Sequence, residues 1–322
     1  MKAAVVSAAG EAPAYVDFAE PVAGEGEEIV TVTAAAISPV TRSRVAGSHY
    51  SSTGTYPVIP GVDGVGRRAD GQRIFFFMPR PPYGTLSERT VIRTGTGIPL
   101  PDDLDDVTAA AIGNPGVSSW AALAERTQFA PGQTVLVNGA TGTSGRLAVQ
   151  IARHLGAGRV IATGRNRDML ERLRGLGADA VIPLGDDDAA LEASLKAEFA
   201  QGVDVVLDYL WGAPARVALV AAARAGREDR PLRFVSIGSV AGPEIALPSA
   251  VLRASTIELV GSGLGSLPPE RLRGSIAALL AAAGAGRLGL DTRLVPLAGI
   301  AAAWTAGDDG ARTVVRPGAA GV

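Results

Sequence analysis

The chain has 322 residues, of which 47% are hydrophobic and 19% are charged. This composition is typical of a folded globular protein of about two domains and excludes a disordered chain. Thirty Lys and Arg residues stand against 32 Asp and Glu residues, so the net charge of −2 excludes a general attraction to nucleic acid or anionic lipid. Cys is absent, which excludes disulfide bonds, thiolate nucleophiles and cysteine-ligated zinc.

No targeting segment is expected, because the beginning of the sequence has one positive charge and only a very short apolar run. The most apolar stretch, residues 276–285, is about half as long as the ~20 residues that a membrane-spanning helix requires. We therefore expect a cytoplasmic protein that has neither a membrane nor a nucleic acid as a partner.

The first hundred residues favour strands and loops. Short β-type runs at 2–6, 27–38, 72–78 and 87–92 are separated by clusters of Gly, Pro and Ser. The frequent prolines in this part of the chain argue against long helices.

From about residue 120 the pattern changes to alternating strands and helices. An apolar strand at 134–139 precedes a helix in which Leu147, Ile151 and Leu155 form one buried face, and Gly156 ends it. A second helix is expected to begin at an N-cap, Asn166, to bury Leu170, Leu173 and Leu176, and to stop at Gly177. The strands of this region are at 134–139, 159–163, 180–182, 203–208 and 233–238. Strands separated by helices of this length predict a parallel sheet with right-handed crossovers.

The end of the chain resumes a mixed pattern. A helix at 269–284 leads to a strand, a short helix and a last strand. The sequence therefore predicts an α/β fold in which a parallel α/β domain is inserted between a β-rich N-terminal part and a returning C-terminal part. We place these parts at residues 1–118, 119–264 and 265–322.

The strongest local motif is NGATGTSG at residues 138–145, between a predicted strand and a predicted helix. Gly142 would allow a pyrophosphate to approach the backbone, and Gly145 would allow the helix to pack closely on the strand. The N–H groups that open the helix favour phosphate. The predicted phosphate-binding residues are Ala140, Gly142, Thr143, Ser144 and Gly145. The alternative is a strand-to-helix junction that binds no ligand.

The end of the second strand indicates which dinucleotide binds. An NAD site usually has Asp or Glu here, whereas this chain has Gly164, Arg165 and Arg167. A carboxylate would repel the 2′-phosphate of NADP(H), and a guanidinium can bind it with two hydrogen bonds. The sequence therefore predicts NADP(H), unless the two arginines are ordinary solvated charges.

Taken together, these segments resemble the medium-chain dehydrogenase/reductase superfamily, and within it the zinc-independent quinone oxidoreductase-like branch. The resemblance covers nearly the whole chain and rests on residues 34–50, 56–68, 108–123, 133–157, 203–212 and 235–239. It implies a GroES-like catalytic domain, built from both ends of the chain, around a Rossmann domain that binds NADP(H).

Two departures from the zinc-dependent relatives bear on metal binding. Where those relatives have Gly-His-Glu, this chain has Gly61, Val62 and Asp63, and no Cys is present. A catalytic zinc needs three protein ligands, and His49 with Asp63 would supply only two. We therefore expect no metal, and no oxidation of ordinary alcohols.

The resemblance also implies the residues of the active site. Ser38 stands where the family has an asparagine near the nicotinamide and the substrate, and Tyr50 is near the family's active-site tyrosine. Either hydroxyl is a candidate donor to a substrate oxygen. Alternatively, Tyr50 and Tyr56 are turn residues on a surface loop. The further implied cofactor contacts are Asn114, Ser118, Asp208, Tyr209, Leu210, Ile237, Gly238, Ser262 and Gly263. Of these, Asp208 is as well explained by capping the helix that follows it.

The activity implied by the resemblance is hydride transfer from NADPH to a quinone or an α,β-unsaturated carbonyl compound (an enone), without zinc. Orientation of the reactants would supply most of the acceleration, and water could supply the proton. The alternatives are a dedicated enoyl or tailoring reductase of a specialised metabolite and a non-catalytic NADPH-binding protein. A homodimer is expected because residues 257–264 form a strand near the sheet edge through which family dimers commonly join.

Overall fold

The computed structural model describes residues 1–49, 52, 54–226, 230–306 and 310–318. The chain forms two compact units, which we call the terminal unit (Met1–Asn114 with Ile276–Val322) and the central unit (Pro115–Ser275). The sequence places the divisions after residues 118 and 264, whereas the structure places them after residues 114 and 275. The first division falls inside helix α2 (Asp106–Ala121) at Pro115, a residue that lacks the N–H group of a regular helical hydrogen bond.

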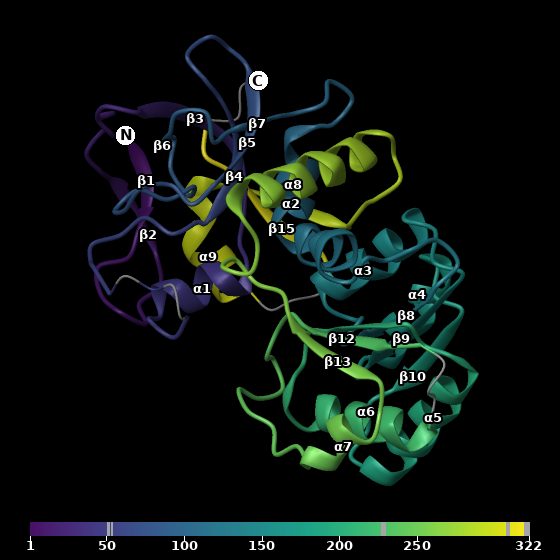
Figure 1. The fold of residues 1–322 in the computed structure, drawn as a ribbon. Coiled ribbons are helices and arrows are strands. Elements are labelled where there is room, and N and C mark those ends of the chain that lie inside the picture. Colours follow the sequence, from purple (N-terminus) through teal and green to yellow (C-terminus); the bar gives the residue numbers. More distant parts are fainter. Residues whose placement is uncertain (50–51, 53, 227–229, 307–309, 319–322) are drawn as a thin grey trace. The chain divides into compact units, whose positions relative to one another are not determined.

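The terminal unit is built on a seven-stranded sheet to which both ends of the chain contribute (Figure 1). Its path runs β14-β15-β3-β4-β5-β7, and β6 also pairs with β3. The strands are β3 (Glu27–Ala36), β4 (Asp63–Arg67), β5 (Arg73–Phe77), β6 (Arg89–Arg93), β7 (Ile98–Pro99), β14 (Thr292–Pro296) and β15 (Arg312–Arg316). The C-terminal part joins the N-terminal part where Val314 pairs with Ala36 and Val315 with Ala35.

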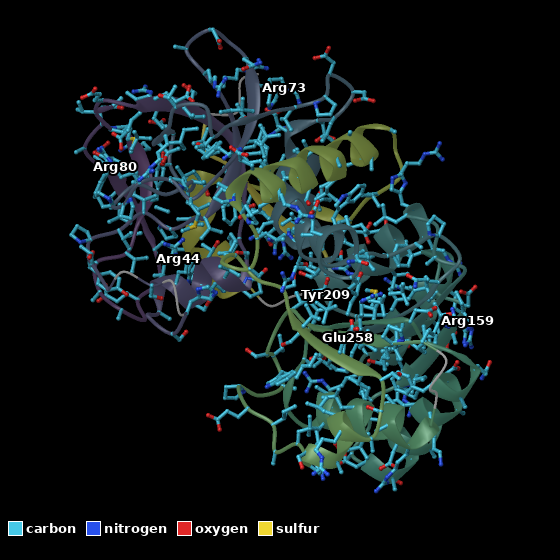
Figure 2. The ribbon with its side chains drawn as sticks, viewed as in Figure 1. Arg44, Arg73, Arg80, Arg159, Tyr209 and Glu258 are labelled. Atoms are coloured by element: carbon cyan, nitrogen blue, oxygen red, sulfur yellow. The ribbon has the colours of Figure 1, made fainter. Side chains whose placement is uncertain are left out.

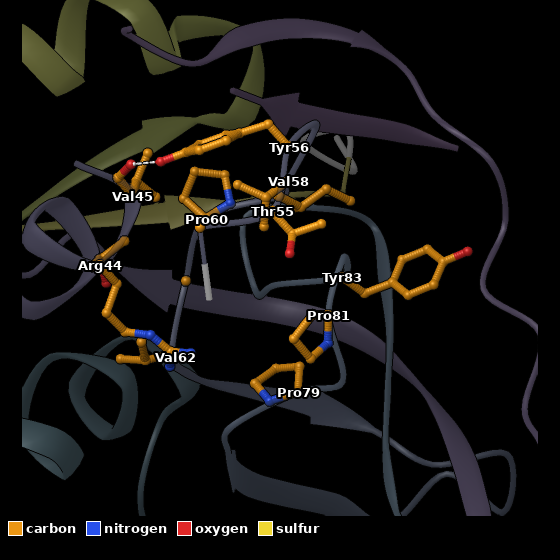
Figure 3. A pocket seen from close by; sticks show the side chains of 14 residues that line it. Arg44, Val45, Thr55, Tyr56, Val58, Pro60, Val62, Pro79, Pro81 and Tyr83 are labelled. Carbon is orange, nitrogen blue, oxygen red and sulfur yellow. Dashed lines mark hydrogen bonds between the residues drawn. The ribbon is translucent and has the colours of Figure 1, made fainter. Parts of the chain in front are cut away.

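Smaller elements complete the terminal unit. A two-stranded sheet contains β1 (Lys2–Val5) and β2 (Ala14–Asp17), and the helices are α1 (Pro39–Val45), most of α8 (Pro269–Gly284), a 3₁₀ turn (Leu297–Gly299) and α9 (Ile300–Thr305). At the start of β5, Arg73, which Figure 2 labels, forms an ion pair with Asp106 at 2.7 Å. The chain from α1 to β4 and the turn that follows β5 enclose a pocket (Figure 3).

The central unit contains a six-stranded, wholly parallel sheet in the order β10-β9-β8-β11-β12-β13. The strands are β8 (Thr134–Asn138), β9 (Arg159–Gly164), β10 (Ala180–Pro183), β11 (Val205–Asp208), β12 (Leu232–Ser236) and β13 (Ile257–Gly261). Counted from β8, this order is 3-2-1-4-5-6, that of a dinucleotide-binding doubly wound sheet, with the change of direction between β8 and β11. The predicted α/β fold class is confirmed.

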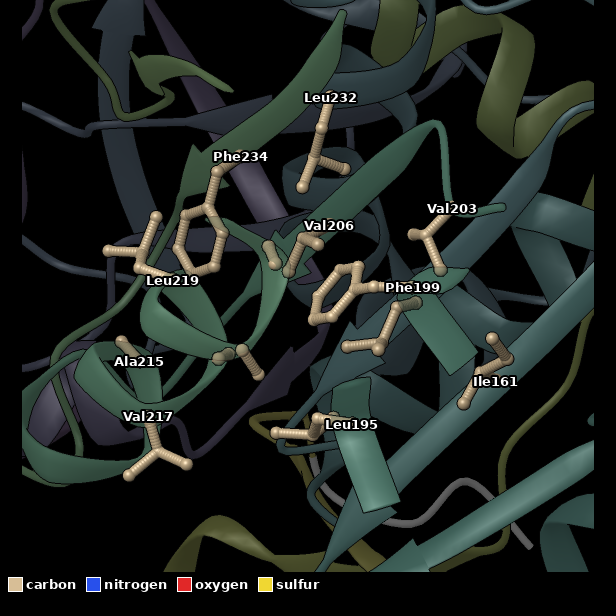
Figure 4. Packing of buried hydrophobic residues seen from close by; sticks show 14 of the residues in the cluster. Ile161, Leu195, Phe199, Val203, Val206, Ala215, Val217, Leu219, Leu232 and Phe234 are labelled. Carbon is tan, nitrogen blue, oxygen red and sulfur yellow. The ribbon is translucent and has the colours of Figure 1, made fainter. Parts of the chain in front are cut away.

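Helices cover the sheet of the central unit. They are α3 (Thr143–His154), α4 (Arg167–Gly175), α5 (Asp188–Gln201), α6 (Gly212–Ala225) and α7 (Ser249–Arg253), and a π-helical turn (Ala122–Arg126) follows α2. Figure 4 shows Phe199 of α5 and Leu219 of α6 among the apolar side chains of the strands, including Phe234 of β12. Burying a side chain of this size stabilises the fold by about 1.5–3 kcal/mol.

The helices end near the predicted glycines, but two leucines that were expected in the core, Leu155 and Leu176, are not fully buried. Asn166 caps α4 by accepting a hydrogen bond from the Met169 N–H group, as expected. Leu155 is only half-buried, and Leu176 is 36% exposed, because α3 ends at His154 and α4 at Gly175. Each leucine is therefore the C-cap residue, where the backbone leaves the helix, and its side chain no longer follows the inner face.

No helix in the described part of the chain is long and apolar enough to cross a membrane.

Candidate functional site

Gly142 and Gly145, which follow β8 at the start of α3, have different surroundings and therefore different roles. Gly142 is the N-cap residue of α3, and a Cβ atom added there would meet no protein atom within 4 Å. A Cβ atom added to Gly145 would lie 2.4 Å from the Gly139 carbonyl oxygen and 2.5 Å from the Ala140 Cα. Gly145 therefore allows the helix to pack against the loop, whereas the space at Gly142 is open to a ligand. This is the division of roles that a pyrophosphate loop requires.

Hydrogen bonds to β9 fix the shape of this loop. The Thr163 hydroxyl donates to Asn138 Oδ1 at 2.6 Å and accepts from the Gly139 N–H group at 3.1 Å. The Ala140 N–H group donates to the Thr163 carbonyl oxygen at 2.7 Å, and Ala140 is fully buried. Ala140 therefore supports the loop from behind. Thr143 and Ser144 open α3, and no acidic residue lies in its first turn to repel a phosphate.

The end of β9 presents two arginines to solvent. Gly164 is buried, and a Cβ atom there would lie 2.3 Å from Thr141 Cγ2. Arg165 and Arg167 are both exposed, and neither forms an ion pair within the described residues. Two such guanidinium groups at the carboxyl end of the second strand fit the 2′-phosphate of NADP(H).

At the point where the strand order changes direction, a buried hydrogen bond joins the side chains of Asn138 and Asp208. Asn138 Nδ2 donates to Asp208 Oδ1 at 2.7 Å, and the Leu210 and Trp211 N–H groups donate to the same carboxylate at 3.2 and 3.0 Å. Burial raises the pKa of Asp208 to about 6, although these three hydrogen bonds oppose the shift. Asp208 therefore holds the turn that leads into α6, but it does not cap this helix, whose N-cap residue is Trp211 and which has no side-chain cap. Its contact with the cofactor stays a prediction.

The other predicted cofactor residues of the central unit also follow the strands. Tyr209 lies with its hydroxyl 3.1 Å from that of Ser118, and burial raises its pKa to about 12. Leu210 packs over Gly139. The Ile237 and Gly238 N–H groups both donate to the Asp208 carbonyl oxygen, at 2.8 and 3.1 Å. After β13, the Ser262 N–H group donates to the Ser236 carbonyl oxygen and the Gly263 N–H group to Ser266 Oγ, both at 2.9 Å. The structure thus brings these residues to the carboxyl end of one sheet.

The predicted catalytic residues of the terminal unit are Ser38 and Tyr50, of which the structure describes Ser38. Ser38 is buried as the N-cap residue of α1, where its hydroxyl accepts from the Thr41 N–H group at 2.9 Å and shares a hydrogen bond with Thr41 Oγ1 at 2.8 Å. Ser38 therefore supports Thr41, which lines the pocket, and its catalytic role stays a prediction. Tyr50 lies outside the described residues.

Asn114 is hydrogen-bonded to Asp63, a buried residue that the sequence interpretation did not select for the active site. Its Nδ2 donates to Asp63 Oδ1 at 3.1 Å, and Asp63 is fully buried on β4. Burial raises the pKa of Asp63 to about 7, while the charge of Arg312 and the Asn114 hydrogen bond oppose the shift. The sequence interpretation considered Asp63 only as an insufficient zinc ligand. The signal that could have found it is an acidic residue that opens a short, glycine-rich and mostly buried strand. Within the described residues, no group of three or more metal-ligating side chains is brought together.

The pocket of the terminal unit is partly open, and its empty volume of about 520 Å³ includes space that is continuous with the solvent. Figure 3 shows the aliphatic and proline side chains of Val62, Pro60 and Pro79 on its walls, with Arg44 at one side. The Tyr56 hydroxyl donates to the Val45 carbonyl oxygen, so Tyr56 forms part of the wall and not only a surface turn. A concavity that combines aliphatic and proline side chains with polar groups and one guanidinium is a candidate small-molecule site.

Comparisons with known proteins agree with this geometry. The family described as zinc-binding dehydrogenase matches residues 145–282. A probable NADPH-dependent quinone reductase of Emericella nidulans is 29% identical, over 95% of this chain and 96% of the relative. An NADPH-dependent alkenal/one oxidoreductase of Arabidopsis thaliana is 28% identical, over 49% of this chain and 45% of the relative.

A solved structure extends the match to the whole fold. The quinone oxidoreductase from Thermus thermophilus, which is also described in complex with NADPH, is 29% identical with a TM-score of 0.78. The match covers 98% of this chain and 100% of that one, so it includes both the sheet built from the chain ends and the parallel sheet. Over nearly its whole length the chain is therefore similar in sequence and fold to quinone oxidoreductases, which agrees with the resemblance to the zinc-independent branch of the medium-chain dehydrogenase/reductase superfamily.

Proposed function

We propose that this protein is an NADPH-dependent reductase that transfers a hydride to a quinone or to an α,β-unsaturated carbonyl compound. The observation that carries this proposal is the open glycine loop at the head of a 3-2-1-4-5-6 sheet, with two arginines at the end of the second strand that form no ion pair among the described residues. The relatives named for NADPH-dependent reduction of quinones and alkenals support the reaction class.

The central unit would hold the cofactor. The backbone at Gly142 and the first N–H groups of α3 would bind the diphosphate, and Arg165 with Arg167 would bind the 2′-phosphate. When bound, NADPH supplies a hydride from its nicotinamide ring. The protein contributes mainly the orientation of the reactants, which is worth several orders of magnitude in rate.

The terminal unit would hold the substrate in its pocket. Negative charge develops on the carbonyl oxygen of the substrate as the hydride arrives, and this oxygen needs a hydrogen-bond donor. Thr41 lines the pocket, and Ser38 fixes its hydroxyl. The proton that completes the reaction would come from water, because an enolate or hydroquinone anion is readily protonated near neutral pH.

The test is the oxidation of NADPH, followed by absorbance, with 1,4-benzoquinone and with 3-penten-2-one, and with NADH in parallel. We expect turnover with NADPH and a value of kcat/KM that is lower with NADH by about tenfold or more, because NADH lacks the 2′-phosphate. Replacing both Arg165 and Arg167 by Gln should raise the KM for NADPH by about tenfold or more, because charged hydrogen-bond donors to the 2′-phosphate are lost. The KM for NADH, which has no 2′-phosphate, should be unchanged. Arg172→Gln is the matched control, because Arg172 is an exposed arginine on α4, the helix that Arg167 opens.

The outcomes separate the alternatives. Binding of NADPH without reduction of either acceptor would favour a dedicated enoyl or tailoring reductase, or a non-catalytic NADPH-binding protein. Absence of NADPH binding would overturn the assignment of the glycine loop.

We also propose that the protein is a homodimer joined through β13. This strand is at the edge of the six-stranded sheet, where unpaired N–H and carbonyl groups can accept a strand of a second copy.

A further inference from the structure

We propose that the pocket of the terminal unit selects quinones and enones that carry a carboxylate group, and that Arg44 binds this carboxylate. The inference rests on the proposed reductase function and adds to it a class of substrate. It follows from one charged side chain in a wall that is otherwise uncharged.

Arg44 differs from several other arginines of the terminal unit in having no acidic partner among the described residues. Ion pairs join Arg68 to Glu28, Arg73 to Asp106, Arg80 to Glu27 and Arg89 to Glu20 in the same unit. Within the part of the chain that the structure describes, Arg44 forms no ion pair, and its Nη1 lies 2.9 Å from the Met78 sulfur, a weak acceptor. Figure 2 labels Arg44 on α1, apart from Arg73 and Arg80.

The surroundings of Arg44 do not compensate its charge. Burial lowers the pKa of Arg44 and is the only cause of the shift, so no nearby carboxylate opposes it. The pKa of His49 is lowered by burial and then by the charge of Arg44. This shift favours the neutral form of His49 and leaves the Arg44 guanidinium as the charged group of this region.

The pocket wall strengthens this argument. None of its described lining residues is acidic, and Arg44 is the one that carries a charge. Val62, Pro79 and Pro81 are among the apolar walls (Figure 3). Charges interact more strongly beside such walls than in bulk water, and a guanidinium matches a carboxylate with two parallel hydrogen bonds.

The other polar side chains of the pocket have different roles. The Tyr56 hydroxyl donates to the Val45 carbonyl oxygen, and Thr41, which shares a hydrogen bond with Ser38, is the proposed donor to the carbonyl oxygen of the substrate. Arg44 is therefore the charged group left to bind a carboxylate. The carboxylate itself is unchanged in the reaction, since the hydride of NADPH and a proton of water are added to the alkene or quinone.

The test compares two substrates that differ in one charge, (E)-4-oxo-2-pentenoate and its methyl ester. We expect wild-type protein to have a higher kcat/KM for the acid. Arg44→Gln should lower kcat/KM for the acid by about 10- to 100-fold, mainly through KM, and should change the value for the ester by less than about threefold. Arg44→Lys, which keeps the charge and loses the planar fork, should be intermediate.

The control is Arg93→Gln, which replaces an exposed arginine on β6 and should leave both substrates unchanged. Equal losses on acid and ester in Arg44→Gln would assign Arg44 a structural role and overturn the proposal. Equal use of both substrates by the wild type would overturn it as well.

A binding experiment keeps this inference separate from the reductase function. The saturated analogue 4-oxopentanoate is titrated by calorimetry into wild type and Arg44→Gln, with NADP⁺ present. Binding to the wild type alone, even if no acceptor is reduced, would support the carboxylate site while the reductase function failed. Absence of binding to either protein would overturn the carboxylate site.

Discussion

Asp63 carries a carboxyl group that the fold removes entirely from water. It lies on β4, and Asn114 Nδ2 donates to one of its oxygens at 3.1 Å. Its other oxygen, Oδ2, is buried without a hydrogen-bond partner within the described residues. A neutral carboxylic acid tolerates this environment better than a carboxylate, which explains why burial raises the pKa of Asp63 to about 7.

The raised pKa predicts how stability depends on pH. The folded state keeps the Asp63 proton up to about pH 7, whereas an unfolded chain loses it near the ordinary value of 3.8. Between these values the folded state binds more protons, so the contribution of Asp63 to stability is lost as the pH rises. Asp63→Asn, which mimics the neutral acid, should remove this loss. Relative to the variant, the wild type should lose about 2–3 kcal/mol of unfolding free energy between about pH 5 and pH 8.

The measurement is urea unfolding of both proteins at these two pH values. Asp208, whose pKa is also raised by burial, is present in both proteins and cancels in the difference. Asp102→Asn, at an exposed aspartate of the same unit, should show no such dependence on pH. A constant difference between wild type and Asp63→Asn across this range would contradict the raised pKa.

At the scale of an element, the β8–α3 loop predicts different effects for its two glycines. Gly145→Ala forces a Cβ atom against the backbone of Gly139 and Ala140, so it should destabilise the protein by about 1–3 kcal/mol. Gly142→Ala meets no protein atom and has an ordinary extended backbone, so the fold should be unchanged. If the diphosphate binds there, the new methyl group should raise the Kd for NADPH by about tenfold or more.

Thermal unfolding and NADPH titration by fluorescence check both substitutions. The decisive observation is Gly142→Ala, because it pairs native stability with weak binding. Native affinity for NADPH in this variant would remove Gly142 from the cofactor site and leave the loop as a structural junction.

The elements also show what the sequence can predict. The strands and helices of the central unit follow from hydrophobic runs, capping residues and glycines, which act within a few positions along the chain. Ser38 was harder to interpret, because a serine before a proline fits both an N-cap and a catalytic hydroxyl. The hydrogen bonds between Ser38 and Thr41 give its structural role.

At the scale of the whole molecule, long-range contacts limit prediction from sequence. Asp63 and Asn114 are 51 residues apart, and the charge that opposes the shift at Asp63 comes from Arg312 on the last strand. No local pattern encodes such neighbours. For the same reason, the sequence does not indicate a role for Arg44. That role depends on the residues that the fold places around it, and none of the described residues that line the pocket is acidic.

The last prediction concerns the assembly of two chains. Leu259 on β13 is 42% exposed at the edge of the parallel sheet, and Leu294 on β14 is 45% exposed at the edge of the other sheet. Light scattering at micromolar concentration should give twice the mass of one chain. Leu259→Lys should shift the protein to the monomer, because a charge on an edge strand opposes pairing. Leu294→Lys is a control of similar exposure and should remain a dimer. A monomeric wild type would exclude the dimer, and dissociation by Leu294→Lys alone would move the interface to β14.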